Sequence, residues 1–162
     1  LGLKQYNQLV PSNKTISLNY IQLRKLVGKH IREMEQSNYD IMLETLKEQY
    51  NANIWYDNFN PLEIKSKEHL SLQYEIPGNH HWGNQTDIIF LQEQLKIKII
   101  LVERDRIWSV NKLEHKYVML IYHIDEIHYQ LGGIKEGKES NIQSVFSYSD
   151  SIIKKIFRFF NL

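Results

Sequence analysis

The seven histidines are the first candidates for acid–base chemistry in this sequence, and His128 has the most favourable setting for it. It follows a polar Asp125-Glu126 turn, opens a predicted strand and precedes Tyr129. A histidine in that position would be held by a rigid sheet and open on one side, which suits a general base. The alternative is a partly exposed turn histidine without a catalytic part.

A metal site is the second possibility for the histidines. On one continuous strand, the odd separation of His123 and His128 would place them on opposite faces, whereas a turn at Asp125-Glu126 would let them approach across a hairpin. No third ligand stands at a persuasive spacing, His80 and His81 are adjacent and diverge, and the chain has no cysteine. We therefore expect no metal, no disulfide and no cofactor.

Two glycine-containing motifs have less specific interpretations. In Trp82-Gly83 the tryptophan can fill the core beside a glycine that permits close approach, or it can line a channel for an extended peptide. Gly132-Gly133 lacks the further glycine and the lysine of a phosphate-binding loop. The G-x-S-x-G motif of serine hydrolases is absent from the sequence.

The composition is that of one ordinary globular domain, which we expect to span residues 1-162. Hydrophobic residues make up 42% of the chain and charged residues 24%, with a net charge of +1. Acids and bases are interspersed, so we expect neither nucleic acid nor a membrane as a partner. The densest basic cluster, Lys154, Lys155 and Arg158, fits a solvated helix face. We expect a cytoplasmic monomer, acting in its own cell or in a host cell.

The elements that must position these residues begin with helices. Apolar residues at helical spacing predict helices from about Leu18 to Met34 and from Tyr39 to Tyr50. A third helix is predicted from Pro61 to about Tyr74, after a loop rich in asparagine and aromatic residues. Pro77-Gly78-Asn79 is a turn signal, and Thr86 is expected to cap the next helix.

Strands follow in the second half of the chain, where β-branched residues are concentrated. Asp87, in the first turn of the fourth predicted helix, suits the positive end of the helix dipole. This helix leads directly into a buried strand, and the succession predicts an α/β (α+β) fold with a small central β-sheet flanked by helices. The predicted elements are the helix Asp87–Lys96, the strands Ile97–Val102, Tyr117–Tyr122 and His128–Leu131, a solvated loop Gly132–Ser140, and a last helix to Phe160 capped by Ser149 or Asp150.

The order of these motifs resembles the C-terminal half of the ovarian tumour (OTU) family of cysteine proteases. The resemblance runs from about Leu18 to Leu131, and order and spacing carry it more than any one motif. In sequence order, it is carried by the Leu-Arg helix segment Ile21–Val27, the Trp-Gly segment His80–Leu91, the strands Ile97–Val102 and Tyr117–Tyr122, and the pair His128-Tyr129.

The resemblance implies a papain-like, OTU-type architecture and thiol-dependent deubiquitinase activity. His128 would be the general base that activates a cysteine for attack on the isopeptide bond at the C-terminus of ubiquitin. Trp82, Gly83 and Tyr129 would line the channel for the glycine-ended tail. The implied partner is ubiquitin or polyubiquitin.

Two departures from the family pattern bear on that activity. Gln130 stands where the family usually has Asp or Asn to orient the imidazole, so it is a possible orienter without a charge. The nucleophile segment would fall at or before Leu1, and the chain has no cysteine. We expect the domain to be N-terminally incomplete and residues 1-162 alone to be inactive.

Three hypotheses therefore follow from the sequence. The first is an OTU deubiquitinase whose nucleophile segment lies outside these residues. The second is a catalytically inactive OTU-like protein that binds ubiquitin or another protein. The third is an α/β interaction domain unrelated to ubiquitin.

Overall fold

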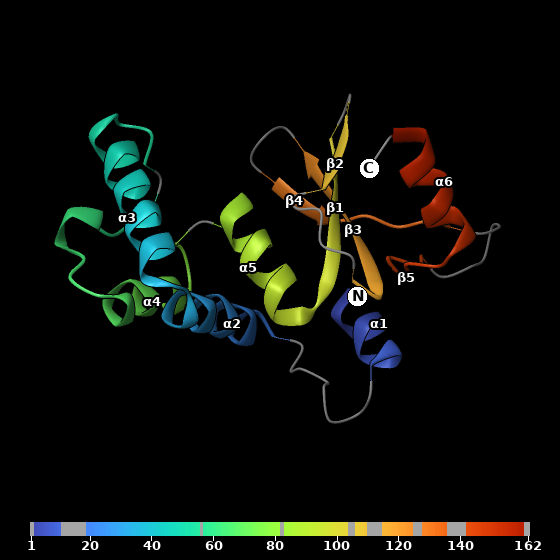
Figure 1. Cartoon of the computed structure of the whole chain (residues 1–162), viewed down its shortest axis with the longest axis horizontal. Helices are drawn as coiled ribbons and strands as arrows, with labels where there is room; N and C mark the ends of the chain where they lie inside the picture. Colours follow the sequence, from blue (N-terminus) through green and yellow to red (C-terminus); the bar gives the residue numbers. More distant parts are fainter. Residues whose placement is uncertain are drawn as a thin grey trace. The chain divides into compact units, whose positions relative to one another are not determined.

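The computed structural model describes residues 2–10, 19–55, 57–81, 83–103, 106–109, 115–124, 128–135 and 142–160. The chain forms two compact units, which we call the helical unit (Asn19–Gln94) and the sheet unit (Leu1–Leu18 with Leu95–Leu162). In chain order (Figure 1) the elements are α1 (Gly2–Leu9), α2 (Tyr20–Glu33), α3 (Gln36–Asn51), the 3-10 turn η2 (Pro61–Glu63), α4 (Lys67–Glu75), α5 (Gln85–Leu95), β1 (Ile97–Val102), β2 (Ile107–Ser109), β3 (Tyr117–Ile124), β4 (His128–Leu131), β5 (Val145–Ser147) and α6 (Ser151–Phe160).

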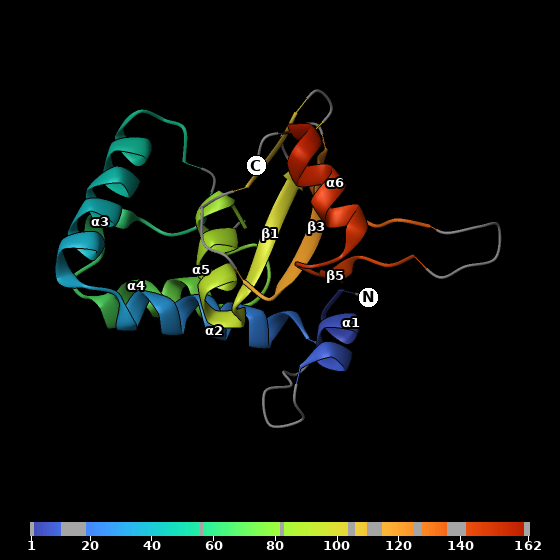
Figure 2. The same ribbon diagram turned by 45° about the vertical axis from the view of Figure 1, so that its right-hand side comes forward.

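Helices α2 and α4 pack side by side in the helical unit, and α3 rises from one end of the pair (Figure 2). The predicted helices near Leu18–Met34 and Tyr39–Tyr50 are confirmed as α2 and α3, with α3 beginning earlier at Gln36. Apolar side chains from all these helices meet in one core, since burial of such faces stabilises helices more than intrinsic propensity does. The core residues are Val27, Ile31, Tyr39, Leu46, Ile64, Leu70, Tyr74 and Phe90.

The third predicted helix is wrong in its first half. Pro61–Glu63 forms only a 3-10 turn, and α4 begins afresh at Lys67. The oxygen Oγ of Ser66 accepts a hydrogen bond from the backbone N–H of His69 at 3.1 Å, which is an N-cap. A helix beginning at the proline would have placed Ser66 in its interior, where serine is less favourable than at a cap.

Helix α5 is confirmed, but Thr86 does not cap it. Asn84 is the capping residue, because its Oδ1 accepts hydrogen bonds from the backbone N–H groups of Thr86 at 2.8 Å and Asp87 at 3.3 Å. Asp87 lies in the first turn, as predicted. The helix ends at Leu95, Lys96 after it has a left-handed φ of 52°, and β1 follows directly.

The sheet unit is built on a five-stranded sheet with the order β2-β1-β3-β4, and β5 also pairs with β3. Strands β1 and β3 are parallel, whereas the other pairs are antiparallel. β5 and β4 pair with the same edge of β3. β5 lies opposite Tyr117–Met119, and β4 lies opposite Ile121–Ile124. Between them, the Leu120 N–H donates to the Ser144 carbonyl at 3.1 Å and the Leu120 carbonyl accepts from the Gly132 N–H at 2.8 Å.

The Gly132-Gly133 pair is required by the close approach of chain segments at this edge. A Cβ on Gly133 would lie 2.1 Å from Ile142 Cγ2 and 2.9 Å from the Gln143 carbonyl oxygen. Gly132 is buried, and Ile134 forms a bridge with Gln143. The prediction of a solvated loop from Gly132 is therefore wrong at its start; residues 136–140 of that loop lie outside the described residues.

Three elements of the sheet unit were not predicted: α1, β2 and β5. Helix α1 is fixed by long-range bonds from Gln5, whose Nε2 donates to the Ile142 carbonyl at 2.7 Å. The Gln5 Oε1 accepts from the N–H groups of Ser144 at 2.7 Å and Val145 at 3.1 Å. Tyr6 is buried and its hydroxyl donates to the Leu95 carbonyl at 2.6 Å. None of these partners is adjacent in sequence, so local patterns could not reveal them.

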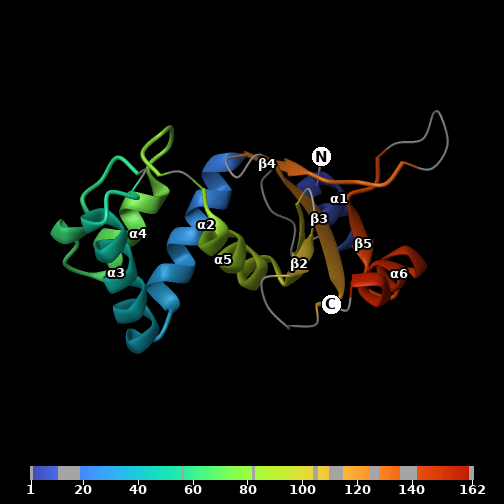
Figure 3. The same cartoon turned by 90° about the horizontal axis from the view of Figure 1, so that it is seen from above.

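Helix α6 packs its apolar side on the sheet next to β5 (Figure 3). Asp150 caps it, with Oδ1 accepting the Ile152 N–H at 2.9 Å, which confirms one of the two predicted caps. The Lys98 ammonium of β1 lies 5.0 Å from the centre of the Phe157 ring, a cation–π contact between strand and helix. The core beneath comprises Ile100, Val118, Leu120, Phe146 and Ile153.

Two substitutions in α6 should differ strongly in their effect on stability. Ile153 is fully buried, so Ile153→Ala should lower the free energy of unfolding by about 2–5 kcal/mol. Phe159 is 79% exposed, so Phe159→Ala should change it by less than about 0.5 kcal/mol. Urea unfolding of both variants is the measurement, and equal losses would contradict this packing of α6.

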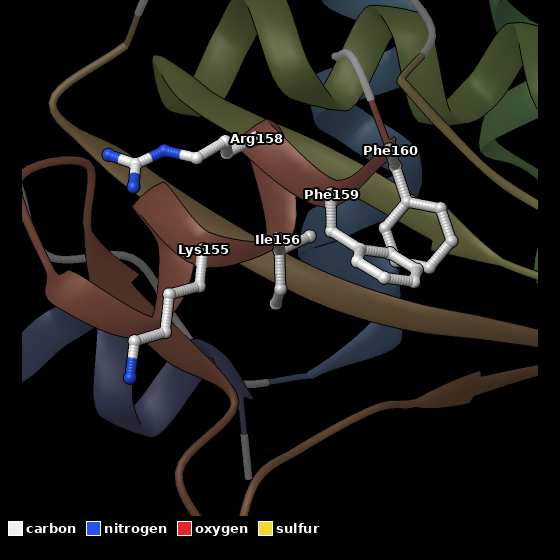
Figure 4. A pocket seen from close by; sticks show the side chains of 5 residues that line it. All are labelled: Lys155, Ile156, Arg158, Phe159 and Phe160. Atoms are coloured by element: carbon white, nitrogen blue, oxygen red, sulfur yellow. The ribbon is translucent and has the colours of Figure 1, made fainter.

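The C-terminal end of α6 carries a shallow hollow lined by Lys155, Ile156, Arg158, Phe159 and Phe160 (Figure 4). The rings of Phe159 and Phe160 lie together, with centroids 4.8 Å apart, and the side chains of Lys155 and Arg158 point away from them.

No helix in the described part of the chain has both the length and the apolar character that crossing a membrane requires.

Candidate functional site

The residues predicted for a site fall in both units. Gly83 belongs to the helical unit and is exposed, whereas His128, Tyr129 and Gln130 form the first part of β4 in the sheet unit. Trp82 and the side chain of His128 lie outside the described residues. The predicted strand beginning at His128 is confirmed. The proposed roles of these residues stay predictions.

The register of β3 and β4 sets the surroundings of the His-Tyr pair. Ile124 stands opposite His128, His123 opposite Tyr129, and Tyr122 opposite Gln130. The rings of His123 and Tyr129 stack with centroids 4.5 Å apart and an interplanar angle of 9°. Gln130 is exposed. Tyr129 is thus held by a neighbour on β3.

A carboxylate just after β1 completes this cluster. Glu103 Oε1 lies 2.9 Å from Nδ1 of His123, and the two side chains are only 11% and 10% exposed. Arg106 makes an ion pair with the other oxygen of Glu103. A histidine oriented by a carboxylate on one nitrogen is held in a fixed position, so the cluster fixes the hairpin of β3 and β4. In the described part of the chain, no group of three or more His, Cys, Asp or Glu side chains could hold a metal ion.

A buried polar network of the helical unit surrounds His81. Its Nδ1 lies 2.6 Å from Asp57 Oδ2 and its Nε2 lies 2.7 Å from Asp87 Oδ2. The side chains of His81, Asp57 and Asp87 are 4%, 7% and 10% exposed. The ring of Tyr74 packs against the imidazole, with centroids 3.9 Å apart. Because ionised carboxylates only accept hydrogen bonds, both contacts are made together when each ring nitrogen carries a proton and the imidazole is charged.

The electrostatics agree with a charged imidazole. Burial alone would lower the pKa of His81, since it disfavours the charged form. The hydrogen bonds to Asp57 and Asp87 and the charges of these carboxylates outweigh burial, and they raise the pKa from 6.5 to about 9. With both nitrogens engaged and the proton tightly held, His81 cannot act as a general base near neutral pH.

The backbone next to His81 is also held by hydrogen bonds. Arg24 of α2 donates hydrogen bonds to the carbonyls of Gly78 and His81, each at 2.9 Å. The backbone N–H of Asn58 donates to the His80 carbonyl at 2.8 Å, and its side-chain amide donates to the Asn79 carbonyl at 2.6 Å. The segment between α4 and α5 is therefore fixed from two sides within the helical unit.

A small polar hollow of about 290 Å³ lies beside this segment. The His80 ring stands at its edge, with Nε2 2.7 Å from Gln73 Oε1 and its plane stacked on Phe59 at 5.7 Å. The hollow is lined by Asn58, Phe59, Asn60, Glu63, Ile64, His69, Gln73 and His80.

The His81 network was missed from the sequence. By residue type and spacing, His80 and His81 suggest metal ligation and Asp87 a charge suited to the helix dipole; the resemblance includes all three in one segment but gives none of them a role. Asp57 precedes His81 by 24 residues, so no short-range spacing links the two. The single local signal was Asp87, which is six residues after His81 and whose Oδ2 also accepts the Asn84 N–H at 2.8 Å.

No family model matches the sequence, and no curated protein matches it. A solved structure described as an Ovarian Tumor (OTU) domain in complex with ubiquitin does match, with a TM-score of 0.50 and 18% sequence identity. The match covers 86% of this chain and 66% of that chain, so this chain spans slightly less than two thirds of its length. The 162 residues contain no cysteine and thus no thiol nucleophile. The chain has the mixed α/β fold of an OTU domain, with a small sheet and helices, as the resemblance implied.

Proposed function

We propose that residues 1–162 act as an OTU-like binding domain that recognises ubiquitin, without cleaving ubiquitin conjugates by themselves. The observation that carries this proposal is an OTU-like fold in 162 residues that contain no cysteine. Thiol chemistry needs a thiolate as the attacking group, and serine or threonine hydroxyls would need an aligned base and oxyanion hole. The matching OTU domain was solved with ubiquitin, which makes ubiquitin the first ligand to test.

Two anchored segments are suited to contact a protein ligand. In the helical unit, exposed Gly83 stands beside the His81 network. In the sheet unit, exposed Gln130 follows Tyr129, which stacks on the Glu103-bound His123 ring. Preorganised surfaces lose less conformational entropy on binding, and this favours recognition by fixed segments over recognition by mobile ones.

Bulky substitutions in these segments should weaken ubiquitin binding without unfolding the protein. Since both side chains are exposed, Gly83→Arg and Gln130→Arg should each leave stability nearly unchanged and raise the Kd at least about tenfold, or about 1.4 kcal/mol. Fluorescence anisotropy with labelled ubiquitin is the measurement. Gln36→Arg, at an exposed position of α3, is the matched control and should bind like the wild type.

Catalysis is tested separately with a ubiquitin probe carrying a C-terminal thiol-reactive warhead. Residues 1–162 should form no covalent adduct and should release no ubiquitin from polyubiquitin. Cleavage by this chain would contradict the proposal. Failure of the wild-type chain to bind ubiquitin would remove ubiquitin as its ligand.

A further inference from the structure

The segment between α4 and α5 combines an exposed surface with an unusually polar anchor. Pro77, Gly78, Asn79 and Gly83 are exposed, whereas His81 is buried between them. Apolar side chains could anchor a loop equally well, because well-packed apolar residues are often as stabilising as a buried ion pair, or more so. What directional hydrogen bonds supply in addition is one defined geometry, although within the described residues Asp87 Oδ1 is buried without a hydrogen-bond partner.

The side chain of His81 connects this segment to the chain on either side of it. The imidazole of His81 joins Asp57, from the loop after α3, to Asp87, in the first turn of α5. The same Oδ2 of Asp87 accepts the N–H of Asn84. A Cβ added to Gly83 would lie 3.6 Å from that oxygen, which is ordinary contact. The chain before and the chain after residue 82 are thus tied to one carboxylate.

On the strength of this geometry, we propose that His81 is a positioning residue for ligand recognition, which holds the backbone at Gly78–His81 and Gly83–Asn84, with its exposed residues Gly78, Asn79 and Gly83, in its binding conformation. This inference rests on the proposed function, because it names one of the segments that would meet ubiquitin. His81 does not itself touch the ligand, since its side chain is 4% exposed.

Proton loss should release one side of this anchor. A neutral imidazole has a single N–H and can donate to Asp57 or to Asp87, not to both. The other groups that face His81 are the Tyr74 ring of α4, which packs on it, and Arg24 of α2, which donates to its carbonyl. Arg24 cannot replace the lost donor, because its guanidinium bonds the backbone carbonyls of Tyr74, Gly78 and His81. Ligand affinity should therefore fall as the pH rises through about 9.

The test compares His81→Gln with His80→Gln, the same change at the neighbouring, half-buried histidine. Without ligand, His81→Gln should speed amide hydrogen exchange at residues 79–81 and 83–84 at least about tenfold relative to α3 amides, and His80→Gln should not. Ubiquitin affinity should fall at least about tenfold in His81→Gln only. Asp57→Asn is a milder second variant that keeps an acceptor oxygen, and its affinity should begin to fall at a lower pH than in the wild type.

The outcomes separate this inference from the proposed function. Unchanged exchange in His81→Gln would overturn the positioning role, as would faster exchange with unchanged ubiquitin affinity and an unchanged pH profile. A wild-type chain that fails to bind ubiquitin would overturn the proposed function instead. In that case, the exchange measurement would still decide whether His81 holds the segment.

Discussion

Asp87→Ala should lower the free energy of unfolding by about 3–5 kcal/mol, because it removes one partner of a buried ion pair. The imidazole of His81 would keep its charge beside Asp57 but lose the acceptor at Nε2, in a site where it is 4% exposed. The N–H of Asn84 would lose its acceptor as well. Urea unfolding at pH 7 measures the loss.

Asp40→Ala is the matched control for that substitution. Asp40 is exposed on α3 and accepts a surface hydrogen bond from Gln36, so its removal should cost less than about 0.5 kcal/mol. Equal effects of the two changes would mean that the His81 network contributes little to stability.

Stability should also decline between about pH 6.5 and pH 9 because of His81. Its pKa is higher in the folded chain, about 9, than the 6.5 of a free histidine, so the folded state binds the proton more tightly. The stabilisation is complete below pH 6.5 and is lost as the pH rises through about 9. At about 1.4 kcal/mol for each pKa unit, it amounts to something on the order of 3 kcal/mol.

Thermal unfolding across pH 6 to 9.5 checks this decline. Burial and the charges of Asp87 and Asp57 raise the pKa of Tyr74 well above 10, so Tyr74 acts only at higher pH and does not obscure the window. His81→Gln should flatten the profile, and His80→Gln should keep it. A wild-type Tm that is constant over this range would contradict the charged state of His81.

The parts of the fold that were predictable are those in which burial and local pattern agree. Strand β1, at Ile97–Val102, was predicted with its observed ends, because almost every position is buried and β-branched residues dominate. Helix α2 was predicted for the same reason, with Val27 and Ile31 on its buried face. β3 extends to Ile124, past the predicted end at Tyr122, since pairing with β4 continues it.

The parts that were not predictable depend on partners distant in sequence. The polar helix α1 exists through the bonds of Gln5 to the β5 region, more than a hundred residues away. β5 is only three residues long and is defined by pairing with β3. Within the candidate site, the role of His81 depends on its hydrogen bond with Asp57, and no sequence rule predicts that these two residues pair.

Local sequence cues bear on two of the helix starts that differ from the prediction. Ser66 before Lys67-Glu68 is a typical N-cap position, and it marks the start of α4 better than Pro61 does. Asn84 and Thr86 are both acceptable caps by residue type, and only the hydrogen bonds of Asn84 decide between them. Side-chain geometry of this kind lies beyond residue preference.

Recognition of ubiquitin by these 162 residues, through an OTU-like fold and without a thiol, is the proposed function. Its most direct test is titration of ¹⁵N-labelled ubiquitin with the chain, followed by amide chemical shifts. We expect saturable shifts that include residues of the ubiquitin C-terminal tail. Gly83→Arg and Gln130→Arg should weaken these shifts, and Gln36→Arg should leave them unchanged. A ubiquitin spectrum that stays unchanged in the presence of excess folded chain would contradict the proposed function.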